Sequence, residues 1–320
     1  MKILMVGHGA FAQKHMDAIS NIPDVEVTAI CGRREDATRA AAEARGITQW
    51  GTDLAECLKF DIDAVIITSA TQVHAEQAIQ CLRAGKHVQV EIPMADTLED
   101  SRAILAAQQE MAKQGKNLVA MAGHTRRFNP SHQWIHKKIQ AGELKVLQMD
   151  VQTYFFRRTN TNAAGQARSW TDHLLWHHAC HTVDLFQYQC GEPVKHAFAL
   201  AGPHHPELDI AMDMSIGMKT ASGALCTLSL SFNNDGPLGT YFRYICDKGT
   251  YLCRYDDLFD GNNEQIDVSK VDVSMNGIEL QDREFTAAIR EGREPNASIA
   301  QCLPAMETLD QLEQSINSTQ

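Results

Sequence analysis

Four histidines crowd one short stretch of the sequence, LLWHHACHTVD together with the residue before it. His173, His177, His178 and His181 lie within nine residues, although the whole chain of 320 residues has fourteen histidines. With Asp184 close behind, this set has three possible uses: a metal site, a catalytic base, or polar packing inside the protein. On an α-helix, which turns about 100° per residue, His173, His177, His181 and Asp184 fall within one sector of about 80°.

The spacing of these histidines permits a metal ion but does not favour one. His-x-x-x-His binds zinc in helical metalloproteases, which carry a Glu beside the first histidine, and this segment has no Glu. We therefore expect no metal. For His173 and His178, polar packing and a functional role are equally open, whereas for His177 and His181 we expect a function.

The composition is typical of a protein that acts on small molecules. The chain has a formal net charge of −11, and 44% of its residues are hydrophobic. This acidity disfavours nucleic acid and anionic membranes as partners, and no apolar stretch is long enough to span a bilayer. The first residues run straight into an apolar strand pattern without a secretory region. We expect a cytoplasmic protein whose nine cysteines are free thiols, since no CxxC pair occurs.

The pattern of apolar residues changes near residue 122. Before it, Val- and Ile-rich runs such as DAVIITS alternate with helical segments, which indicates a parallel sheet covered by helices on both faces. After it, hairpin-like units around TASG and DKG and two closing helices indicate an α+β domain with an antiparallel sheet. The expected fold class is α/β: a doubly wound parallel sheet in residues 1–122, followed by an α+β domain with a mostly antiparallel sheet in residues 123–320.

A phosphate cradle follows the first expected strand. The motif VGHGAFA has Gly7 for a tight turn, Gly9 for close approach of a pyrophosphate, and small Ala12 for close packing of the next helix. Ala10 and Phe11 belong to the same turn. Because the motif follows a strand, opens a helix and begins a β-α-β series, it favours cofactor binding over a purely structural turn.

The end of the second strand bears on the choice of dinucleotide. NAD-binding proteins usually carry an acidic residue there for the ribose hydroxyl, whereas this chain has Gly32, Arg33 and Arg34. Two guanidinium groups suit a 2′-phosphate, so we expect NADP to be preferred and NAD to be used less well. The alternative is two solvated arginines at the start of a helix. Further cofactor contacts are expected in the loops after the third and fourth strands, from Thr68, Ala70, Thr71, His74, Glu91 and Ile92.

On these motifs the chain resembles the glucose-fructose oxidoreductase/inositol dehydrogenase family. It shares the GxGxxA turn, TSATQVHAEQA after the third strand, Glu-x-Pro at 91–93, GHTRRFNP at 123–130 and a helix that ends His181-x-x-Asp184. The resemblance implies an N-terminal Rossmann domain and a C-terminal domain whose open sheet often mediates dimers. It also implies a dehydrogenase that uses a nicotinamide cofactor, and we expect a homodimer.

Two positions depart from that family. Most relatives have a Lys where this chain has Ile92, and an Asp where it has His177. Without that lysine, a histidine has to take the proton during oxidation, since a neutral imidazole titrates near the working pH. We expect His181 to be the catalytic base, Asp184 to fix its tautomer and His177 to hold the hydroxyl or ring oxygen of the substrate.

Further stretches, among them QVEIP and MDVQTYFFRR, resemble family members that oxidise a cyclic hemiacetal with two carboxylates to a lactone. We therefore expect a small dicarboxylate substrate. Arginine binds carboxylates in bidentate fashion, so arginines are the main candidates to hold them. Arg126, Arg127 and Asn129 rank first because the resemblance implies that the stretch GHTRRFNP lines the cleft. The other candidates for substrate binding are Arg158, Arg168, Trp170, His178 and Asn233.

Two rival interpretations remain. One is a sugar or inositol dehydrogenase of the same family, but Ile92 and His177 replace groups that those enzymes normally use. The other is an NADP-binding regulator without catalytic activity. The retained His181-x-x-Asp184 pattern disfavours this second rival.

Overall fold

The computed structural model describes residues 1–161, 165, 171–268 and 277–318. The chain forms two compact units, one of Met1–Thr125 with Ile278–Leu303 and one of Arg126–Gly277 with Pro304–Gln320. We expected residues 123–320 to form the second domain as one piece. In the structure, residues 278–303 pack with the first unit instead, because buried polar side chains of a C-terminal helix bond to residues there.

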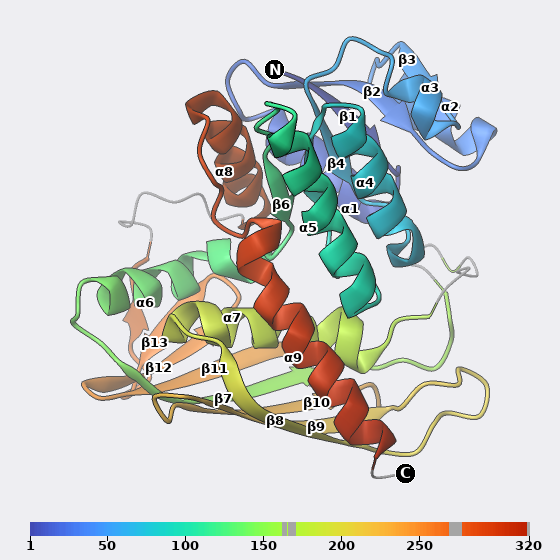
Figure 1. The fold of residues 1–320 in the computed structure, drawn as a ribbon. Coiled ribbons are helices and arrows are strands. Elements are labelled where there is room, and N and C mark those ends of the chain that lie inside the picture. Colours follow the sequence, from blue (N-terminus) through green and yellow to red (C-terminus); the bar gives the residue numbers. More distant parts are fainter. Residues whose placement is uncertain (162–164, 166–170, 269–276, 319–320) are drawn as a thin grey trace. The chain divides into compact units, whose positions relative to one another are not determined.

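The first unit is built on a six-stranded sheet with the order β3-β2-β1-β4-β5-β6 (Figure 1). All of its strand pairs are parallel. Every residue of β4 is fully buried, which requires cover on both faces because successive side chains point in opposite directions. The doubly wound α/β prediction is confirmed. The strands are β1 (Lys2–Val6), β2 (Glu26–Cys31), β3 (Gln49–Gly51), β4 (Ala64–Ile67), β5 (His87–Val90) and β6 (Ala120–Ala122).

Helices connect these strands, and two of them, α4 and α5, lie side by side in Figure 1. The strand order reverses at β1, which lies between β2 and β4. In doubly wound sheets, ligands bind beyond the carboxyl ends of the strands at such a reversal. The helices of this unit are α1 (Ala10–Ile19), α2 (Glu35–Ala44), α3 (Leu54–Cys57), α4 (His74–Arg83), α5 (Leu98–Lys113), α8 (Gly277–Glu291) and the start of α9 (Ile299–Asn317), with a 3₁₀ turn at Thr71–Val73.

The second unit is built on an eight-stranded sheet with the order β14-β13-β12-β11-β7-β10-β9-β8. Its strand pairs are antiparallel except β7 with β10. The expected hairpins around TASG and DKG are β9–β10 and β11–β12, so the α+β prediction is confirmed as well. The strands are β7 (Val146–Tyr154), β8 (Val194–Ala201), β9 (Asp213–Thr220), β10 (Leu225–Ser231), β11 (Gly239–Cys246), β12 (Gly249–Arg254), β13 (Asp257–Asp260) and β14 (Gln265–Ile266).

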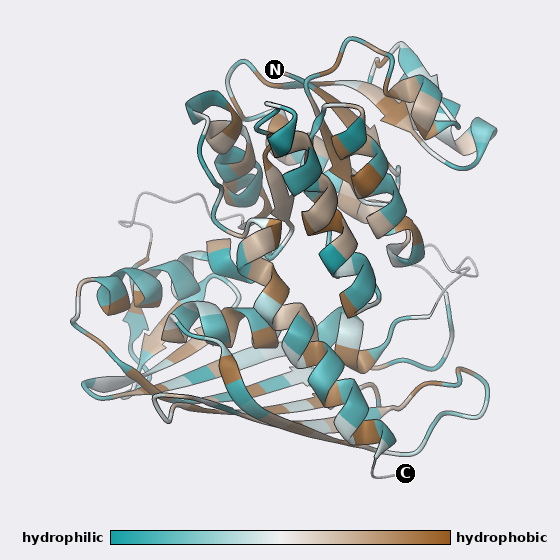
Figure 2. Ribbon diagram, viewed as in Figure 1, coloured by the Kyte–Doolittle hydropathy of each residue, from teal (hydrophilic) through white to brown (hydrophobic). Residues whose placement is uncertain are grey.

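The helices of the second unit lie over one face of this sheet, and the opposite face carries none in Figure 1. Along β9, Met214, Ile216 and Met218 are buried while the residues between them are more exposed. Figure 2 shows that the strands of this sheet carry both hydrophobic and hydrophilic residues. No helix in the described part of the chain is both long and apolar enough to cross a membrane. The covering helices are α6 (Pro130–Gln140), α7 (Cys180–Cys190) and the remainder of α9, and a 3₁₀ turn spans Thr125–Phe128.

Candidate functional site

Gly7, directly after β1, has a backbone conformation that favours glycine, with φ at +104°. Its amide donates to the carbonyl oxygen of Cys31 at 2.8 Å. A Cβ at this position would come within 2.6 Å of Thr68 Oγ1. This glycine therefore lets the ends of β1, β2 and β4 meet at the point where the strand order reverses.

Gly9 is the residue before α1, and it leaves the start of that helix open. It makes no side-chain cap, and nothing lies within 4 Å of the place where its Cβ would be. Ala12 is fully buried against the sheet, whereas Ala10 and Phe11 are exposed. Free amides at a helix N-terminus attract anions. This turn accordingly fits the pyrophosphate of a dinucleotide, which would be held by backbone groups of residues 7–12.

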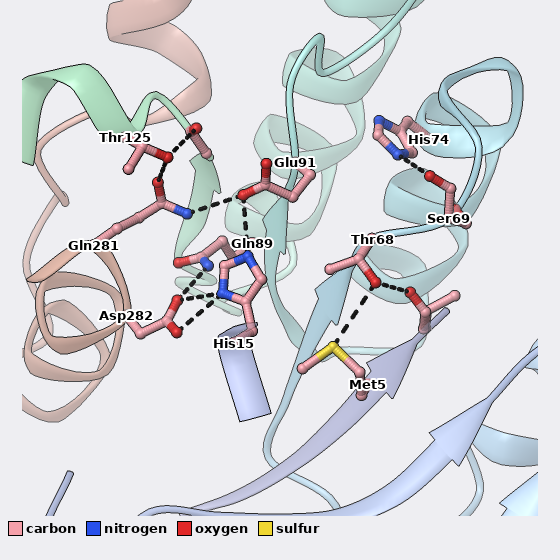
Figure 3. Close-up of polar contacts among 12 residues, drawn as sticks. Met5, His15, Thr68, Ser69, His74, Gln89, Glu91, Thr125, Gln281 and Asp282 are labelled. Atoms are coloured by element: carbon pink, nitrogen blue, oxygen red, sulfur yellow. Dashed lines mark hydrogen bonds and ion pairs between the residues drawn. The ribbon is translucent and has the colours of Figure 1, made fainter. Parts of the chain in front are cut away.

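The loops after β4 and β5 are tied to each other by His74. Its Nδ1 lies 2.8 Å from the carbonyl oxygen of Pro93. Its Nε2 lies 3.1 Å from the carbonyl oxygen of Ser69 (Figure 3). Thr68 Oγ1 donates to the carbonyl oxygen of Val6 at 2.9 Å. The His74 and Thr68 side chains thus shape the carboxyl-end loops. Three other predicted cofactor residues belong to the same loops: Ala70, Thr71 and Ile92.

Glu91 was expected at the cofactor, but its side chain joins a buried cluster (Figure 3). Its Oε1 lies 3.1 Å from Nε2 of His15, and it accepts a hydrogen bond of 3.1 Å from Gln281. On the other side of the His15 ring, Nδ1 lies 2.9 Å from Asp282, which also accepts from Gln89. These contacts engage Oε1 of Glu91, and its role at the cofactor stays a prediction.

The His15 cation supports both carboxylates of this cluster, although burial still raises the pKa of Asp282 above its usual value. Burial alone would lower the pKa of His15, but the carboxylates of Asp282 and Glu91 outweigh it and raise the pKa to about 10. Burial acts to raise the pKa of Glu91, yet hydrogen bonds from His15 and Gln281 hold it below its usual value. Near neutral pH, His15 is thus a buried cation that holds α1, the end of β5 and α8 together.

Arg33 and Arg34 are exposed at the carboxyl end of β2, and Arg34 directly precedes α2. The glycine turn itself contributes His8 to this place, a residue not predicted from the sequence. Its ring packs against Gly32, where an added Cβ would come within 2.7 Å of His8 Cδ2. One imidazole and two guanidinium groups are thus associated with the end of β2, where the ribose of the adenosine is expected.

In the second unit, the histidine segment is not the single α-helix that we expected. Leu174–Ala179 form a π-helix and α7 begins only at Cys180, while His173 lies before the helix in an extended conformation. A π-helix turns less per residue than an α-helix, so the expected common sector of His173, His177 and His181 is wrong for this segment. Short π-helices occur frequently at functional sites.

His177 has a defined protonation state in this π-helix. Its Nδ1 accepts a hydrogen bond of 2.9 Å from the backbone amide of His173. Burial lowers the pKa of His177 to about 4, with help from His178 and His173 and against the opposite effect of Asp172. At neutral pH the ring is therefore uncharged with its proton on Nε2, which makes it a hydrogen-bond donor rather than a base.

Asp184 forms a buried, bidentate ion pair with Arg127. The Nε of Arg127 donates to Oδ2 at 2.8 Å and Nη2 donates to Oδ1 at 2.6 Å, with the two side chains 4% and 1% exposed. The guanidinium also stacks on the ring of Tyr188, 4.6 Å from its centre. We expected Arg127 to bind a substrate carboxylate and Asp184 to fix the tautomer of His181. Because the two side chains bind each other instead, the structure favours a positioning role for both residues.

Arg126 and Asn129 lie where α6 meets the turn between β12 and β13. The guanidinium of Arg126 stacks 4.9 Å from the ring centre of Tyr255, and its buried Nε has no hydrogen-bond partner among the described residues. Asn129 donates to Asp256 at 2.8 Å. Arg126 is thus a half-buried cation whose Nε has spare donor capacity, as a carboxylate site requires.

The remaining candidates for substrate binding differ in their contacts. His178 packs against the rings of Phe155 and Phe232. Arg158 donates to the carbonyl oxygen of Phe232 at 3.2 Å. Asn233, the next residue, instead donates to Asp213 at 2.6 Å and lines a hollow of about 330 Å³ with residues of β9 and β10. Arg168 and Trp170 lie outside the described residues.

Comparisons with known proteins agree with this geometry. Residues 1–120 match a family model described as "Oxidoreductase family, NAD-binding Rossmann fold", and residues 130–272 match "Bacterial oxidoreductases, C-terminal". The chain is 62% identical, over 98% of both chains, to a 4-carboxy-2-hydroxymuconate-6-semialdehyde dehydrogenase of Sphingobium sp.. The chain belongs to the glucose-fructose oxidoreductase/inositol dehydrogenase family.

More distant members of this family are also similar to the chain. An inositol 2-dehydrogenase of Paenarthrobacter aurescens is 27% identical over 78% of this chain and 74% of its own length. A levoglucosan dehydrogenase, solved with NADH and levoglucosan, has the same fold, with a TM-score of 0.86 over 99% and 97% of the two chains at 20% identity. Like its relatives, the chain is an oxidoreductase with a Rossmann domain that binds a nicotinamide dinucleotide.

Replacing Asp282 by Asn should destabilise this family member strongly, because it leaves the His15 cation with one carboxylate in a buried site. We expect a loss of about 3–5 kcal/mol near neutral pH, measured by thermal or urea unfolding. The stabilising effect of a raised histidine pKa is complete below the unfolded value of 6.5 and is lost as the pH rises through about 10. The difference between wild type and variant should therefore shrink toward pH about 10.

The matched control is Glu56→Gln, which breaks an exposed pair with Lys59 in the same unit. Such pairs contribute about 0–1 kcal/mol. If Asp282→Asn unfolds with the same midpoint as Glu56→Gln, the charged cluster is not what holds α8 to this unit.

Proposed function

We propose that the chain oxidises the cyclic hemiacetal of 4-carboxy-2-hydroxymuconate-6-semialdehyde to the lactone 2-pyrone-4,6-dicarboxylate, with NADP as the preferred cofactor. The observation that carries this proposal is the 62% identity over nearly the whole length of both chains to the Sphingobium dehydrogenase. The reaction would belong to the 4,5-cleavage route of protocatechuate, in the breakdown of aromatic compounds. We further propose a cytoplasmic location.

The hemiacetal carbon loses a hydride and its hydroxyl loses a proton, so that the C–O bond becomes the lactone carbonyl. When bound, the oxidised nicotinamide accepts the hydride. The proton needs a base, and Ile92 supplies none. His177 has a pKa of about 4 and its Nδ1 already accepts a hydrogen bond, so it is a poor base and a good donor. We therefore assign the base to His181 and the hydrogen bond to the substrate oxygen to His177.

We assign the carboxylate contacts first to Arg126, whose buried Nε has no partner among the described residues. Arg127 is bound to Asp184 by two hydrogen bonds, so we assign these two residues to positioning α7, which carries His181. His178 and Arg158 stay candidates for substrate binding. The contact of Asn233 with Asp213 lends it less support. Arg168 and Trp170 remain predictions.

The wild-type chain should reduce NADP with the cyclic hemiacetal as substrate, and more slowly reduce NAD. The measurement is the absorbance of the reduced nicotinamide together with that of the pyrone product. A panel of myo-inositol, scyllo-inositol and glucose serves as the control and should give no turnover. Turnover of a polyol but not of the hemiacetal would favour the sugar dehydrogenase, and cofactor binding without any turnover would favour a regulator.

Replacing His181 by Asn should lower kcat by about 100- to 10,000-fold with little change in cofactor affinity. The rate of the wild type should rise with pH as its base loses a proton. Because His177 is already neutral above pH about 5, His177→Gln should lower the rate without moving this inflection. A near-normal kcat in His181→Asn, or an inflection that moves in His177→Gln, would contradict the assignment.

We also propose that the chain forms a homodimer through the open face of the eight-stranded sheet. That face carries exposed apolar side chains, with Phe198 60% and Leu200 57% exposed on β8 and Leu225 44% exposed on β10. Clusters of this kind mark association surfaces. Light scattering after size-exclusion chromatography should give a dimer for the wild type and a monomer for Phe198→Asp. The control Phe11→Ser, at an exposed residue of the first unit, should leave the mass unchanged.

A further inference from the structure

The imidazole of His8 occupies the space that a side chain at residue 32 would need. His8 is the residue between the two glycines of the phosphate turn. A Cβ added to Gly32 would lie 2.7 Å from its Cδ2 and 3.3 Å from its Nε2. The same Cβ would also meet Oγ1 of Thr38, which is held in place by a hydrogen bond of 2.7 Å to the carbonyl oxygen of Arg34.

This contact changes the role of Gly32. From the sequence, the glycine leaves room for a phosphate at a position where NAD-binding proteins have an acidic residue. In the structure, the room is taken by the His8 ring and Thr38. The absence of a side chain at residue 32 therefore serves to place an imidazole, a group with two nitrogens that can donate when protonated, at the end of β2.

The one charge that shifts the pKa of His8 among the described residues is positive. Arg34, which directly precedes α2, is exposed and acts on His8 by its charge. Burial and this charge lower the pKa of His8 below its usual value of 6.5, with the effect of burial being the larger. From β1, α1 and β4, no acidic group of the described residues is among the causes of this shift. A hydrogen bond with its own backbone acts in the opposite direction on His8 and is the smallest of the three causes. Among the described residues, His8 thus meets the cation Arg34 and no carboxylate that shifts its pKa.

We propose that His8, together with Arg34, binds the 2′-phosphate of NADP and selects this cofactor over NAD. The inference rests on the proposed NADP preference and extends it to a residue of the glycine turn itself. A phosphate monoester carries nearly two negative charges at neutral pH and accepts several charge-assisted hydrogen bonds. NAD has an uncharged hydroxyl at this place.

We expect His8 to take up a proton when the 2′-phosphate of NADP binds. In the free protein His8 is uncharged near neutral pH, and a dianion beside it favours the imidazolium form. Binding of NADP therefore takes up a proton, whereas binding of NAD takes up none. As a consequence, the affinity for NADP should increase as the pH falls from about 8 to about 6.5, while the affinity for NAD stays level.

Isothermal titration calorimetry of the full chain at pH about 7.5, in two buffers that differ in ionisation enthalpy, measures this proton uptake directly. At that pH the phosphate itself is almost fully deprotonated, so it releases few protons. The wild type should take up a fraction of a proton with NADP and none with NAD. His8→Asn and His8→Gln should abolish the uptake and weaken NADP about 10-fold, with NAD changed less than about twofold.

Two controls separate the causes. Arg34→Gln should weaken NADP but keep the proton uptake, and Gly9→Ala should weaken both cofactors alike because its Cβ enters the open space at the start of α1. Thermal unfolding verifies that each variant is folded. Proton uptake that persists in both His8 variants, or an equal loss of NAD and NADP affinity, overturns the role of His8. If the wild type binds NAD and NADP with equal affinity and takes up no proton, the inferred cofactor selection is overturned. If the wild type binds NADP tightly but does not oxidise the hemiacetal, the proposed function fails while the inference on His8 stands.

Discussion

A buried carboxylate has to be compensated by a cation, and in the first unit this requirement determines which helices meet. Asp282 of α8 and Glu91 after β5 lie on opposite sides of the His15 ring, which comes from α1. Leaving either carboxylate alone in such a place would cost several kcal/mol. The glycine turn lies at the start of α1. The contacts of His15 with α8 and with the end of β5 therefore also fix the position of this turn relative to the carboxyl ends of the central strands.

In the second unit, the buried carboxylate of Asp184 is compensated by the guanidinium of Arg127. Both side chains are almost fully buried, and their two parallel hydrogen bonds define the orientation of α7 relative to the chain before α6. A carboxylate that is fully engaged in this way is poorly suited to exchange protons. Proton transfer in this chain is therefore more readily assigned to imidazole than to carboxylate, in agreement with an isoleucine at residue 92, which cannot take a proton.

The secondary-structure elements were predicted well from local sequence patterns. The helical and strand periodicities of apolar residues, and the glycine turns, are all visible among neighbouring residues. The parallel sheet, the hairpins β9–β10 and β11–β12, and a tight turn at Gly7 were all expected. The cluster around His15 was not, since its members lie up to 267 residues apart and no local pattern links them. The π-helix was missed for a different reason: a projection at 100° per residue assumes a regular α-helix, whereas Leu174–Ala179 turn less per residue, so the projection misplaced these side chains.

The histidines of this chain show how one residue type acquires different chemistry from its surroundings. His15 lies between two carboxylates, and its pKa of about 10 keeps it a cation at neutral pH. His177 is buried near other histidines, and its pKa of about 4 keeps it neutral there. His8 lies beside an arginine with no acidic partner acting on it, so its charge depends on what binds next to it. The cation stabilises the fold, the neutral ring can donate a hydrogen bond at any physiological pH, and the third ring is free to respond to an anion. Motif spacing alone cannot make this distinction, because it depends on the sign of the charge that each ring meets in three dimensions.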